Sequence, residues 1–576
     1  TDVAQLRRMM YVLFLVLLSL VSRTCSAGPL VSTGLGELEG VEDVTVEGKK
    51  IYAFLGVPYA KPPVGKNKFE EPRPAQRWAG SWPATQLPAE CLQHMLNYDL
   101  PDLDLIVGDE DCLYLNIYTP TVINSTLLPV LVFFHGGAFM YGTGNIFTPH
   151  FLLDRTNIVY VSVNYRLGPF GFLSTGDEVT PGNNGLKDQV LALKWIQENI
   201  GSFGGNRFEV TISGMSAGGA SVHLHYMSPL STGLFKRGIS MSGSALNPWV
   251  LTEAPVEKAK QLAASLGCPT DISKLMMQCL KRRPGRKILA QLKSLYWPWL
   301  TQPIAPFGVV IEAGGLHPFL PEHPYKLIAE GAVSDLPWLV SVTAHEGLYP
   351  GASFVDREEL LNELNVNWTG IAPHLLDYNY TVPPESLDTV SDQIRQFYLE
   401  DQEISLETRD KVIQMIGDRM FVVDMEKAAR SQAAVTRSPV YFYKFAYPGK
   451  YSISLFLTKN NVTVGVSHAD DLIYLLSRPI LTPLETEEDK AVSQKMINIW
   501  TSFIATGKPS PDAATQWDPV DSGVDPETNF VYLLINSAQD IKQQTSPDLG
   551  NREFWDSLEF EELQNVVSQM PVKDEL

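Results

Sequence analysis

The chain has 576 residues and a formal net charge of −20, because 65 Asp and Glu outnumber 45 Lys and Arg. This acidic balance argues against nucleic-acid binding, since neutralising phosphates needs a concentrated basic surface. Hydrophobic residues make up 44% and charged residues 19%, which excludes intrinsic disorder and provides ample material for a core. No internal repeat or linker is evident, so we expect one large domain over residues 28–572.

The first residues indicate a targeting signal. An apolar run over residues 10–21 follows two arginines and is itself followed by small residues. This pattern is typical of a secretory signal peptide, here over residues 9–27 and cut before Gly28, and it is too short for a spanning helix. Residues 1–8 precede the first methionine, and we expect them to be non-native or leader sequence. No other run has spanning length, so no membrane anchor is expected.

Cysteine usage fits an oxidising compartment. Cys25 leaves with the leader, and the other four cysteines form an even set. Loop length favours bridges between chain neighbours, which pairs Cys91 with Cys112 and Cys268 with Cys279; four buried thiols are the alternative. N-glycosylation sequons, which suit a lumenal protein, occur at Asn124, Asn367, Asn379 and Asn461.

Apolar runs predict the first elements of the fold. The segments 129–134 and 158–163 are rich in β-forming residues and predict strands, and continuous apolar strands are typical of a sheet covered on both faces. A helix is expected over 186–200. This alternation predicts a parallel, doubly wound sheet of the α/β class. Residues 255–430 indicate further helices joined by proline-rich loops.

A glycine loop follows the first of these strands, in His135-Gly136-Gly137-Ala138-Phe139. In esterases the backbone N–H groups of such a loop face an oxyanion. The small residues let the backbone approach a substrate closely. A simple glycine turn is the alternative interpretation.

A second motif joins a strand to a helix. The β-prone run 208–212 leads into Gly214-Met215-Ser216-Ala217-Gly218 and then into a helix start. A serine on such a sharp turn is a nucleophile elbow, and the helix N-terminus behind it favours developing negative charge. A bare G-x-S-x-G match can also be a glycine-rich loop, but the flanking strand and helix favour the elbow.

Acyl transfer at a serine also needs a base, a group that orients the base, and donors for the oxyanion. In α/β-hydrolases the chain order is serine, acid, histidine, each after a strand of the sheet. The β-prone run 340–343 ends before Glu346, and the run 462–466 ends before His468. Chain order leaves three neighbouring rivals open: His345, Asp470 and Asp471.

The sequence closes with Lys573-Asp574-Glu575-Leu576. A terminal K-D-E-L is read by a retrieval receptor in the early secretory pathway. Together with the signal peptide, it predicts a soluble resident of the endoplasmic reticulum lumen.

Ordered motifs run along nearly the whole mature chain. They are Leu55-Gly56-Val57-Pro58-Tyr59-Ala60, Glu110-Asp111-Cys112-Leu113-Tyr114-Leu115-Asn116, Asn164-Tyr165-Arg166-Leu167-Gly168, Phe170-Gly171-Phe172, Gly185-Leu186-Lys187-Asp188-Gln189, Phe203-Gly204-Gly205-Asn206 and Ser213-Gly214-Met215-Ser216-Ala217-Gly218-Gly219. Through them the chain resembles the type-B carboxylesterases, which include cholinesterases and juvenile hormone esterases, and in particular insect-type carboxylesterases of the secretory pathway with a K-D-E-L terminus. The resemblance implies an α/β-hydrolase fold, with a large and mostly parallel central sheet flanked by helices.

The resemblance also implies roles for individual residues. It assigns Ser216 as the nucleophile, Glu346 as the acid and His468 as the base. The implied oxyanion hole consists of three backbone N–H groups, those of Gly137, Ala138 and Ala217. The two disulfides of the family match the pairing given above. Trp249 looks like the aromatic residue of the acyl pocket, with a buried core tryptophan as the alternative.

Two departures from the family pattern narrow the substrate. The residue before the nucleophile is commonly Glu in the family and Gln in juvenile hormone esterases, but here it is Met215. Cholinesterases hold the quaternary ammonium on a tryptophan within the first disulfide loop, and the segment 91–112 has none. These differences argue against hormone esters and choline esters.

The predicted function is therefore hydrolysis of small-to-medium apolar carboxylic esters, through an acyl-enzyme, in the lumen of the endoplasmic reticulum. Neither a metal nor an organic cofactor is expected, and the expected partners are a small ester and the retrieval receptor. A lumenal lipase, amidase or acyltransferase with the same triad is the main alternative, because acceptor choice depends on pocket shape and water access. The complete triad argues against a catalytically silent binding protein.

Overall fold

The computed structural model describes residues 28–95, 105–122, 126–296, 304–456, 458, 464–477, 484–521, 529–558 and 560. Several predictions lie outside these residues. They are the leader at 1–8, the signal peptide at 9–27, the terminal signal at 573–576 and the sequons at Asn124 and Asn461.

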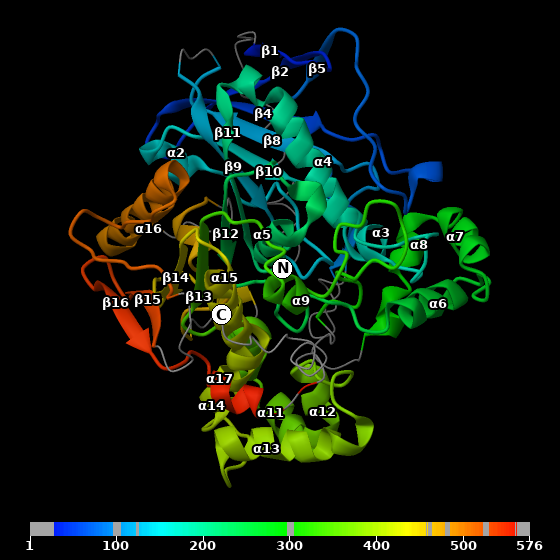
Figure 1. Ribbon diagram of the computed structural model, residues 1–576, viewed down its shortest axis with the longest axis vertical. Helices are drawn as coiled ribbons and strands as arrows, with labels where there is room; N and C mark the ends of the chain where they lie inside the picture. The colour runs from blue at the N-terminus through cyan, green and yellow to red at the C-terminus, as the bar shows by residue number, and fades with distance from the viewer. Residues whose placement is uncertain are drawn as a thin grey trace, which may run out of the picture.

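A sheet of eleven strands lies at the centre of the described structure (Figure 1). In spatial order its strands are β16 (Ile541–Ser546), β15 (Phe530–Ile535), β14 (Val440–Phe445), β13 (Trp338–Thr343), β12 (Arg237–Met241), β11 (Gly205–Met215), β9 (Leu128–Phe134), β10 (Val159–Val163), β8 (Tyr114–Thr119), β4 (Lys50–Pro58) and β3 (Val41–Val44). The strands between β10 and β15 run parallel, while β16 at one margin and β8, β4 and β3 at the other pair antiparallel. The expected large and mostly parallel sheet is confirmed.

Two smaller sheets complete the described strands. One contains β1 (Leu30–Ser32), β2 (Glu37–Glu39) and β5 (Ser81–Pro83), and the other contains β6 (Gln93–Met95) and β7 (Leu105–Val107).

The central sheet is buried on both faces. Alternate residues of β9 enter two separate hydrophobic cores, with Val130, Val132 and Phe134 in one and Leu131 and Phe133 in the other. Side chains alternate between the faces of a strand, so a strand covered on both sides has a continuous apolar sequence. This burial explains why the apolar runs at 129–134 and 158–163 predict strands.

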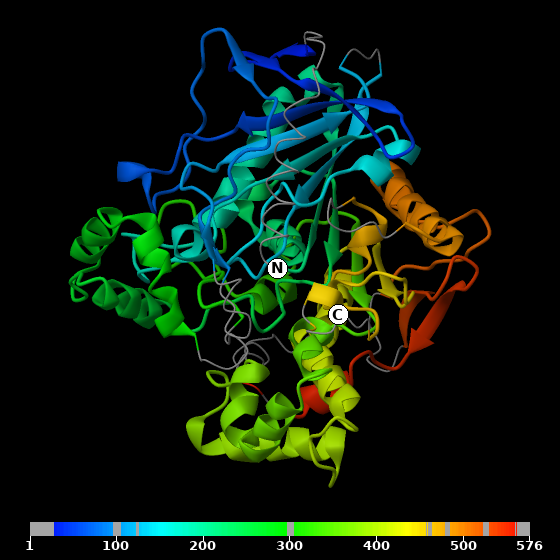
Figure 2. The same cartoon turned by 180° about the vertical axis from the view of Figure 1, so that it is seen from behind.

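Helices provide the cover. The core on one face includes residues of α4, α5, α9 and α15, and the core on the other face includes residues of α2 and α16. The helices are α2 (His150–Arg155), α3 (Gly168–Phe172), α4 (Asn184–Asn199), α5 (Ala217–Met227), α6 (Pro255–Ser265), α7 (Ser273–Lys281), α8 (Gly285–Leu289), α9 (Pro324–Ala329), α10 (Leu348–Gly351), α11 (Glu358–Val366), α12 (Trp368–Leu375), α13 (Leu387–Leu399), α14 (Arg409–Gly417), α15 (Val423–Val435), α16 (Glu487–Thr506) and α17 (Arg552–Asp556). In both views, α11 to α13 gather at one end of the molecule and α6 to α8 at one side (Figures 1 and 2). No helix in the described part of the chain is both long and apolar enough to cross a bilayer.

One predicted strand is wrong. The described part of the run 462–466, Val464 to Val466, is not a strand, and an isolated bridge between His345 and Ser467 is the nearest β contact. Gly465 has a φ of +135°, and a Cβ at this position would lie 2.9 Å from Nδ1 of His345. The alternating valines predict a strand, but the backbone instead bends at Gly465, close to His345.

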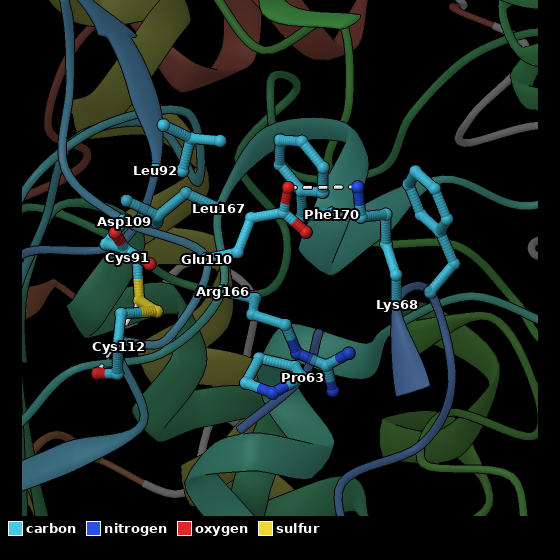
Figure 3. A pocket seen from close by; sticks show the side chains of 11 residues that line it. Pro63, Lys68, Cys91, Leu92, Asp109, Glu110, Cys112, Arg166, Leu167 and Phe170 are labelled. Atoms are coloured by element: carbon cyan, nitrogen blue, oxygen red, sulfur yellow. Dashed lines mark hydrogen bonds and ion pairs between the residues drawn. A yellow bond between two sulfur atoms is a disulfide. The ribbon is translucent and has the colours of Figure 1, made fainter. Parts of the chain in front are cut away.

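Both predicted disulfides are present, Cys91–Cys112 and Cys268–Cys279. The first borders a small hollow, shown in Figure 3. Lys68 Nζ lies 2.9 Å from Glu110 Oε1 in its wall.

Two of the sequence motifs meet beside this hollow. Arg166 lines it and forms a buried ion pair with Asp188 of α4, at 2.7 Å between Nη2 and Oδ1. Burial still raises the pKa of Asp188, although the guanidinium opposes the shift. The pair anchors the segment that leads from β10 into α3, and the N–H of Gly168 at the start of α3 donates to Phe139 O at 2.7 Å. This motif segment thus contacts the end of the glycine loop through the hydrogen bond between Gly168 and Phe139.

Candidate active site

Ser216 is the single residue between the end of β11 and the start of α5. Its φ of 58° and ψ of −125° lie in a region that non-glycine residues rarely adopt, as the strained turn of a nucleophile elbow requires. The Ser216 N–H donates to Met241 O at 2.8 Å, and its carbonyl accepts from Ala220 N at 2.9 Å. The surrounding strand and helix therefore hold the strained conformation.

The glycines of the motif allow α5 to pack directly on the sheet. A Cβ at Gly218 would lie 2.0 Å from the backbone oxygen of Phe134, and one at Gly214 would lie 2.3 Å from the backbone of Gly218. Only glycine fits such contacts, since real Cβ atoms do not approach backbone this closely. The elbow is therefore pressed against the end of β9, where the glycine loop begins.

The glycine loop has an unusual backbone. Gly137 has a φ of 110°, and both Ala138 and Phe139 also have positive φ, at 53° and 59°. The N–H groups of Gly137 and Ala138 donate to no other described residue. The N–H of Ala217 lies in the first turn of α5, where no intrahelical acceptor exists. The three predicted oxyanion donors are thus all uncommitted.

The loop is fixed at its beginning. Tyr165 OH donates to His135 O at 2.7 Å, and the two rings stack with centroids 4.3 Å apart. Burial lowers the pKa of His135 to about 4, so its imidazole is neutral and its Nδ1–H donates to Gly136 O at 2.8 Å. A neutral ring adds no charge to the site.

Glu346 and His468 form a buried pair. His468 Nδ1 lies 2.6 Å from Glu346 Oε2, and the two residues are 5% and 1% exposed. Since the contact is to a carboxylate, Nδ1 carries the proton and Nε2 carries the lone pair. Nε2 is buried and makes no hydrogen bond to any described residue. The imidazole is thus oriented at one nitrogen and available as a base at the other.

The other oxygen of Glu346 is held from the sheet. Its Oε1 accepts from Ser242 Oγ at 2.5 Å and from the N–H of Thr343 at 2.6 Å. Ser242 follows Met241, whose carbonyl accepts from the N–H of Ser216. A short run of contacts between the ends of β11, β12 and β13 thus leads from Ser216 to Glu346.

Two of the rival residues instead fix the loop that carries His468. The backbone N–H of His345 donates to Val466 O at 2.9 Å, and its Nδ1 accepts from Val466 N at 3.1 Å. Asp470 accepts from Ser467 N and from Ser452 Oγ, both at 2.7 Å. Among the described residues, neither side chain forms a hydrogen bond with the carboxylate of Glu346.

Asp471, the third rival, is bonded to side chains of two strands of the central sheet. Its Oδ2 accepts from Tyr443 OH at 3.0 Å and from Ser341 Oγ at 3.1 Å, while its buried Oδ1 has no partner among the described residues. Burial raises its pKa to about 7, with a further rise from the charge of Glu346.

Aromatic side chains surround His468. Trp249 is buried, and its Nε1 donates to Met420 O at 2.9 Å. Its ring lies 6.0 Å from that of Phe421, which lies 4.4 Å from His468. The ring of Tyr349 stacks on His468 at 5.5 Å. The structure thus places Trp249 one ring away from the Glu346–His468 pair.

Sequence reasoning missed Phe421, Tyr349 and Ser242. Phe421 lies in a π-helical turn, η8 (Asp418–Val422), between α14 and α15. Such turns occur often at functional sites, but no sequence pattern marks this one. Tyr349 was three positions beyond a predicted acid, which is the one signal that could have found it.

The remaining predicted residues differ in their distance from this site. Met215 is half-buried, and its Cε would lie 3.1 Å from a Cβ at Gly136. Asn367 is exposed between α11 and α12, whereas Asn379 is half-buried. No group of three or more potential metal-ligating side chains is found in the described ranges.

The carboxylesterase family matches residues 27–554. The chain belongs to this family. It is 44% identical over 536 residues to venom carboxylesterase-6 of Apis mellifera, covering 93% of this chain and 95% of that protein. It is 42% identical to esterase FE4 of Myzus persicae, covering 95% and 96%.

A solved structure supports the same placement. The crystal structure of juvenile hormone esterase from Manduca sexta, with OTFP covalently attached, superposes with a TM-score of 0.80 at 26% identity, covering 92% of this chain and 99% of that chain. The fold is therefore the α/β-hydrolase fold, and the protein is an enzyme, a carboxylesterase.

Proposed function

We propose that the carboxylesterase acts through an acyl-enzyme on Ser216, with His468 as the base and Glu346 as the acid that orients it. The observation that carries the proposal is the 2.6 Å contact between His468 Nδ1 and Glu346 Oε2, because it leaves the basic Nε2 uncommitted. The strained backbone of Ser216 supports its role, since an elbow serine presents its hydroxyl at the edge of the sheet.

The chemistry follows from these positions. His468 Nε2 takes the Ser216 proton as Oγ attacks the ester carbonyl, and the imidazolium is stabilised by the Glu346 carboxylate. The C–O bond to the alcohol then breaks, and His468 gives its proton to the leaving oxygen. Water repeats these steps on the acyl-enzyme, which releases the acid and restores Ser216.

The negative charge of each tetrahedral intermediate needs donors. The uncommitted N–H groups of Gly137, Ala138 and Ala217 supply them. Loss of one such donor typically lowers kcat by about 10²–10³-fold. The fixed backbone of the glycine loop supports this role, since preorganised donors need no rearrangement as charge develops.

The substrates are small-to-medium apolar esters. The apolar surroundings support this class, since Trp249, Phe421 and the half-buried Met215 lie near the triad. A lipase, amidase or acyltransferase would use the same triad, and a panel of esters, matched amides and added alcohol acceptors separates these activities.

The decisive variant is Ser216→Ala, which we expect to abolish hydrolysis of short aryl esters by the purified mature protein. Ser228→Ala is the matched control, because Ser228 is a buried serine at the end of the same helix whose Oγ has no partner among the described residues. An active Ser216→Ala variant would overturn the assignment.

The enzyme is further proposed to reside in the lumen of the endoplasmic reticulum. The signal-peptide pattern at 9–27, the terminal Lys573-Asp574-Glu575-Leu576 and the sequons support this location. Deletion of the last four residues should release the protein into the medium of expressing cells, and so should an extension that masks the terminus. Unchanged retention of both variants would contradict a retrieval signal.

A further inference from the structure

Two tyrosine hydroxyls meet beside His468. Tyr141 OH and Tyr349 OH lie 2.6 Å apart, although the residues are 208 positions apart in the sequence. Tyr141 follows the glycine loop, and Tyr349 follows Glu346 at the end of β13. The contact therefore joins two loops that each carry part of the proposed catalytic machinery.

Each tyrosine contacts one component of that machinery. The Tyr349 ring stacks on the imidazole of His468, with centroids 5.5 Å apart and planes 26° apart. The N–H of Tyr141 donates to Gly137 O at 3.0 Å, and a Cβ at Gly137 would lie 3.0 Å from the Tyr141 ring. The pair thus spans the space between the proposed base and the oxyanion donors.

The two tyrosines are only partly exposed to solvent. Each is half-buried, so part of its surface is open, yet burial raises the pKa of both phenols above the ordinary value. The two hydroxyls therefore remain protonated and act as neutral hydrogen-bond donors. Each hydroxyl is thus a neutral group on a partly accessible side chain, and the Tyr349 ring lies against His468.

The contact leaves one donor unused. The two phenols carry two protons, and their single oxygen–oxygen contact uses one of them. No other described residue forms a hydrogen bond with either hydroxyl. If Tyr141 donates to Tyr349, the Tyr349 proton is free to donate onward, and a chain of this kind strengthens the outer hydrogen bond.

The pair lies apart from the aromatic group on the proposed acyl side. Trp249, Phe139 and Phe421 form one series of ring contacts that reaches His468. Tyr141 and Tyr349 reach it separately. Because His468 gives its proton to the leaving oxygen, the alcohol part of the ester extends past the imidazole, next to the ring stacked on it.

We propose that Tyr349, supported by Tyr141, donates a hydrogen bond to an oxygen atom in the alcohol part of the substrate. The enzyme then prefers esters whose alcohol carries an ether or hydroxyl oxygen a few bonds from the ester group. This inference rests on the proposed roles of Ser216 and His468, and it adds one polar specificity contact to an otherwise apolar pocket.

Two isosteric esters test it, 2-methoxyethyl acetate and butyl acetate, which differ by an oxygen in place of a methylene. The measured quantity is the ratio of their kcat/KM values, compared between variants so that intrinsic reactivity cancels. We expect Tyr349→Phe to lower this ratio about 3- to 10-fold. Tyr141→Phe should lower it less, because Tyr349 keeps its own proton.

Tyr532→Phe is the matched control, since the hydroxyl of Tyr532 on β15 bonds to no described residue, and it should leave the ratio unchanged. Hydrolysis of butyl acetate reports whether each variant is folded. An equal loss for both esters would overturn the proposal and indicate a purely structural latch.

A second pair, methyl 3-methoxypropanoate and methyl pentanoate, places the same exchange in the acyl part. If Tyr349→Phe changes the ratio of this pair instead, the alcohol-side assignment is overturned. If the wild type hydrolyses none of the four esters any faster than Ser216→Ala does, the proposed function itself fails, which is a distinct result.

Discussion

The orientation of His468 depends on how two oxygens of one carboxylate are shared. Glu346 Oε1 accepts from Ser242 Oγ and Thr343 N, so Oε2 remains for the imidazole. Glu346 is buried, and the oxygens of a buried carboxyl group need hydrogen-bond partners. A rigid acid fixes the ring of the proposed base, in the same way that supporting contacts orient ligands in other sites.

Removing one of these donors should therefore slow the reaction. In Ser242→Ala, Glu346 keeps the Thr343 N–H but loses a hydrogen bond to a charged group, which is worth about 1.5–3 kcal/mol. We expect kcat to fall about 10-fold with little change in KM, because Ser242 touches the acid and not the substrate. Steady-state kinetics on one aryl ester, with Ser228→Ala as the control, measure the effect. An unchanged kcat would mean that the backbone donor alone fixes the carboxylate.

Residue types and chain order offered Ser216, Glu346 and His468 as candidates, because those signals are local, and the family resemblance then assigned their roles. The same signals could not separate Glu346 from Asp470 and Asp471, because these acids differ only in their contacts. Asp470 bonds to its own loop, and Asp471 bonds to side chains of β14 and β13. Ser242, Tyr349 and Phe421 had no motif, because their roles come from packing between distant segments.

At the scale of elements, the prediction succeeded for three apolar runs that form buried strands and for one amphipathic helix. The segments 129–134, 158–163, 186–200 and 340–343 correspond to β9, β10, α4 and β13. It failed before His468, where valines flank Gly465 in a turn. The π-helical turn η8 was also beyond reach, because all of its residues are buried and no alternation of polar and apolar residues marks the extra residue.

The packing of α5 against β9 predicts a strong effect at Gly218. A Cβ there would lie 2.0 Å from Phe134 O, and backbone on both sides cannot yield as a side chain would. We expect Gly218→Ala to lower the free energy of unfolding by about 3 kcal/mol or more and to abolish ester hydrolysis. Thermal unfolding and folded yield measure the change.

Gly201→Ala is the control for this substitution. A Cβ at Gly201 meets nothing within 4 Å, so the variant should match the wild type in stability and activity. A stable and active Gly218→Ala variant would contradict the close packing that positions the elbow.

At the scale of the whole molecule, the carboxyl groups behind the net charge of −20 include some with lowered and some with raised pKa values. Near the surface, hydrogen bonds from Lys495 and Thr515 hold the pKa of Asp512 low. In the interior, burial raises the pKa of Asp418 to about 6 and those of Asp470 and Asp471 to about 7. Composition predicted the excess of acids but not which of them are buried.

The raised and lowered pKa values of these carboxyls contribute to stability over different ranges of pH. A carboxyl with a raised pKa holds a proton in the folded state that the unfolded chain releases above about pH 4, so stability falls as pH rises toward 7. Carboxylates with a lowered pKa lose their contribution as pH falls below about 4. The three buried carboxyls therefore contribute stability that is lost between about pH 4 and 7. The buried His135, His223 and His225, with pKa values of about 3 to 4, act in the opposite sense below about pH 6.5. We therefore expect the carboxyl contribution to appear as a difference in stability between the wild type and a variant that lacks one of these acids.

Asp471→Asn tests this expectation. The amide resembles the protonated acid and does not ionise. Between about pH 5 and 7, the free energy of unfolding of the wild type should therefore fall relative to that of the variant by about 1.4 kcal/mol per pH unit. Asp418 and Asp470 contribute equally to both proteins. Asp518→Asn is the control, because Asp518 is exposed and its pKa is lowered, so the slope in this range should stay unchanged. If Asp471→Asn changes with pH in the same way as the wild type, Asp471 does not hold this proton in the folded protein.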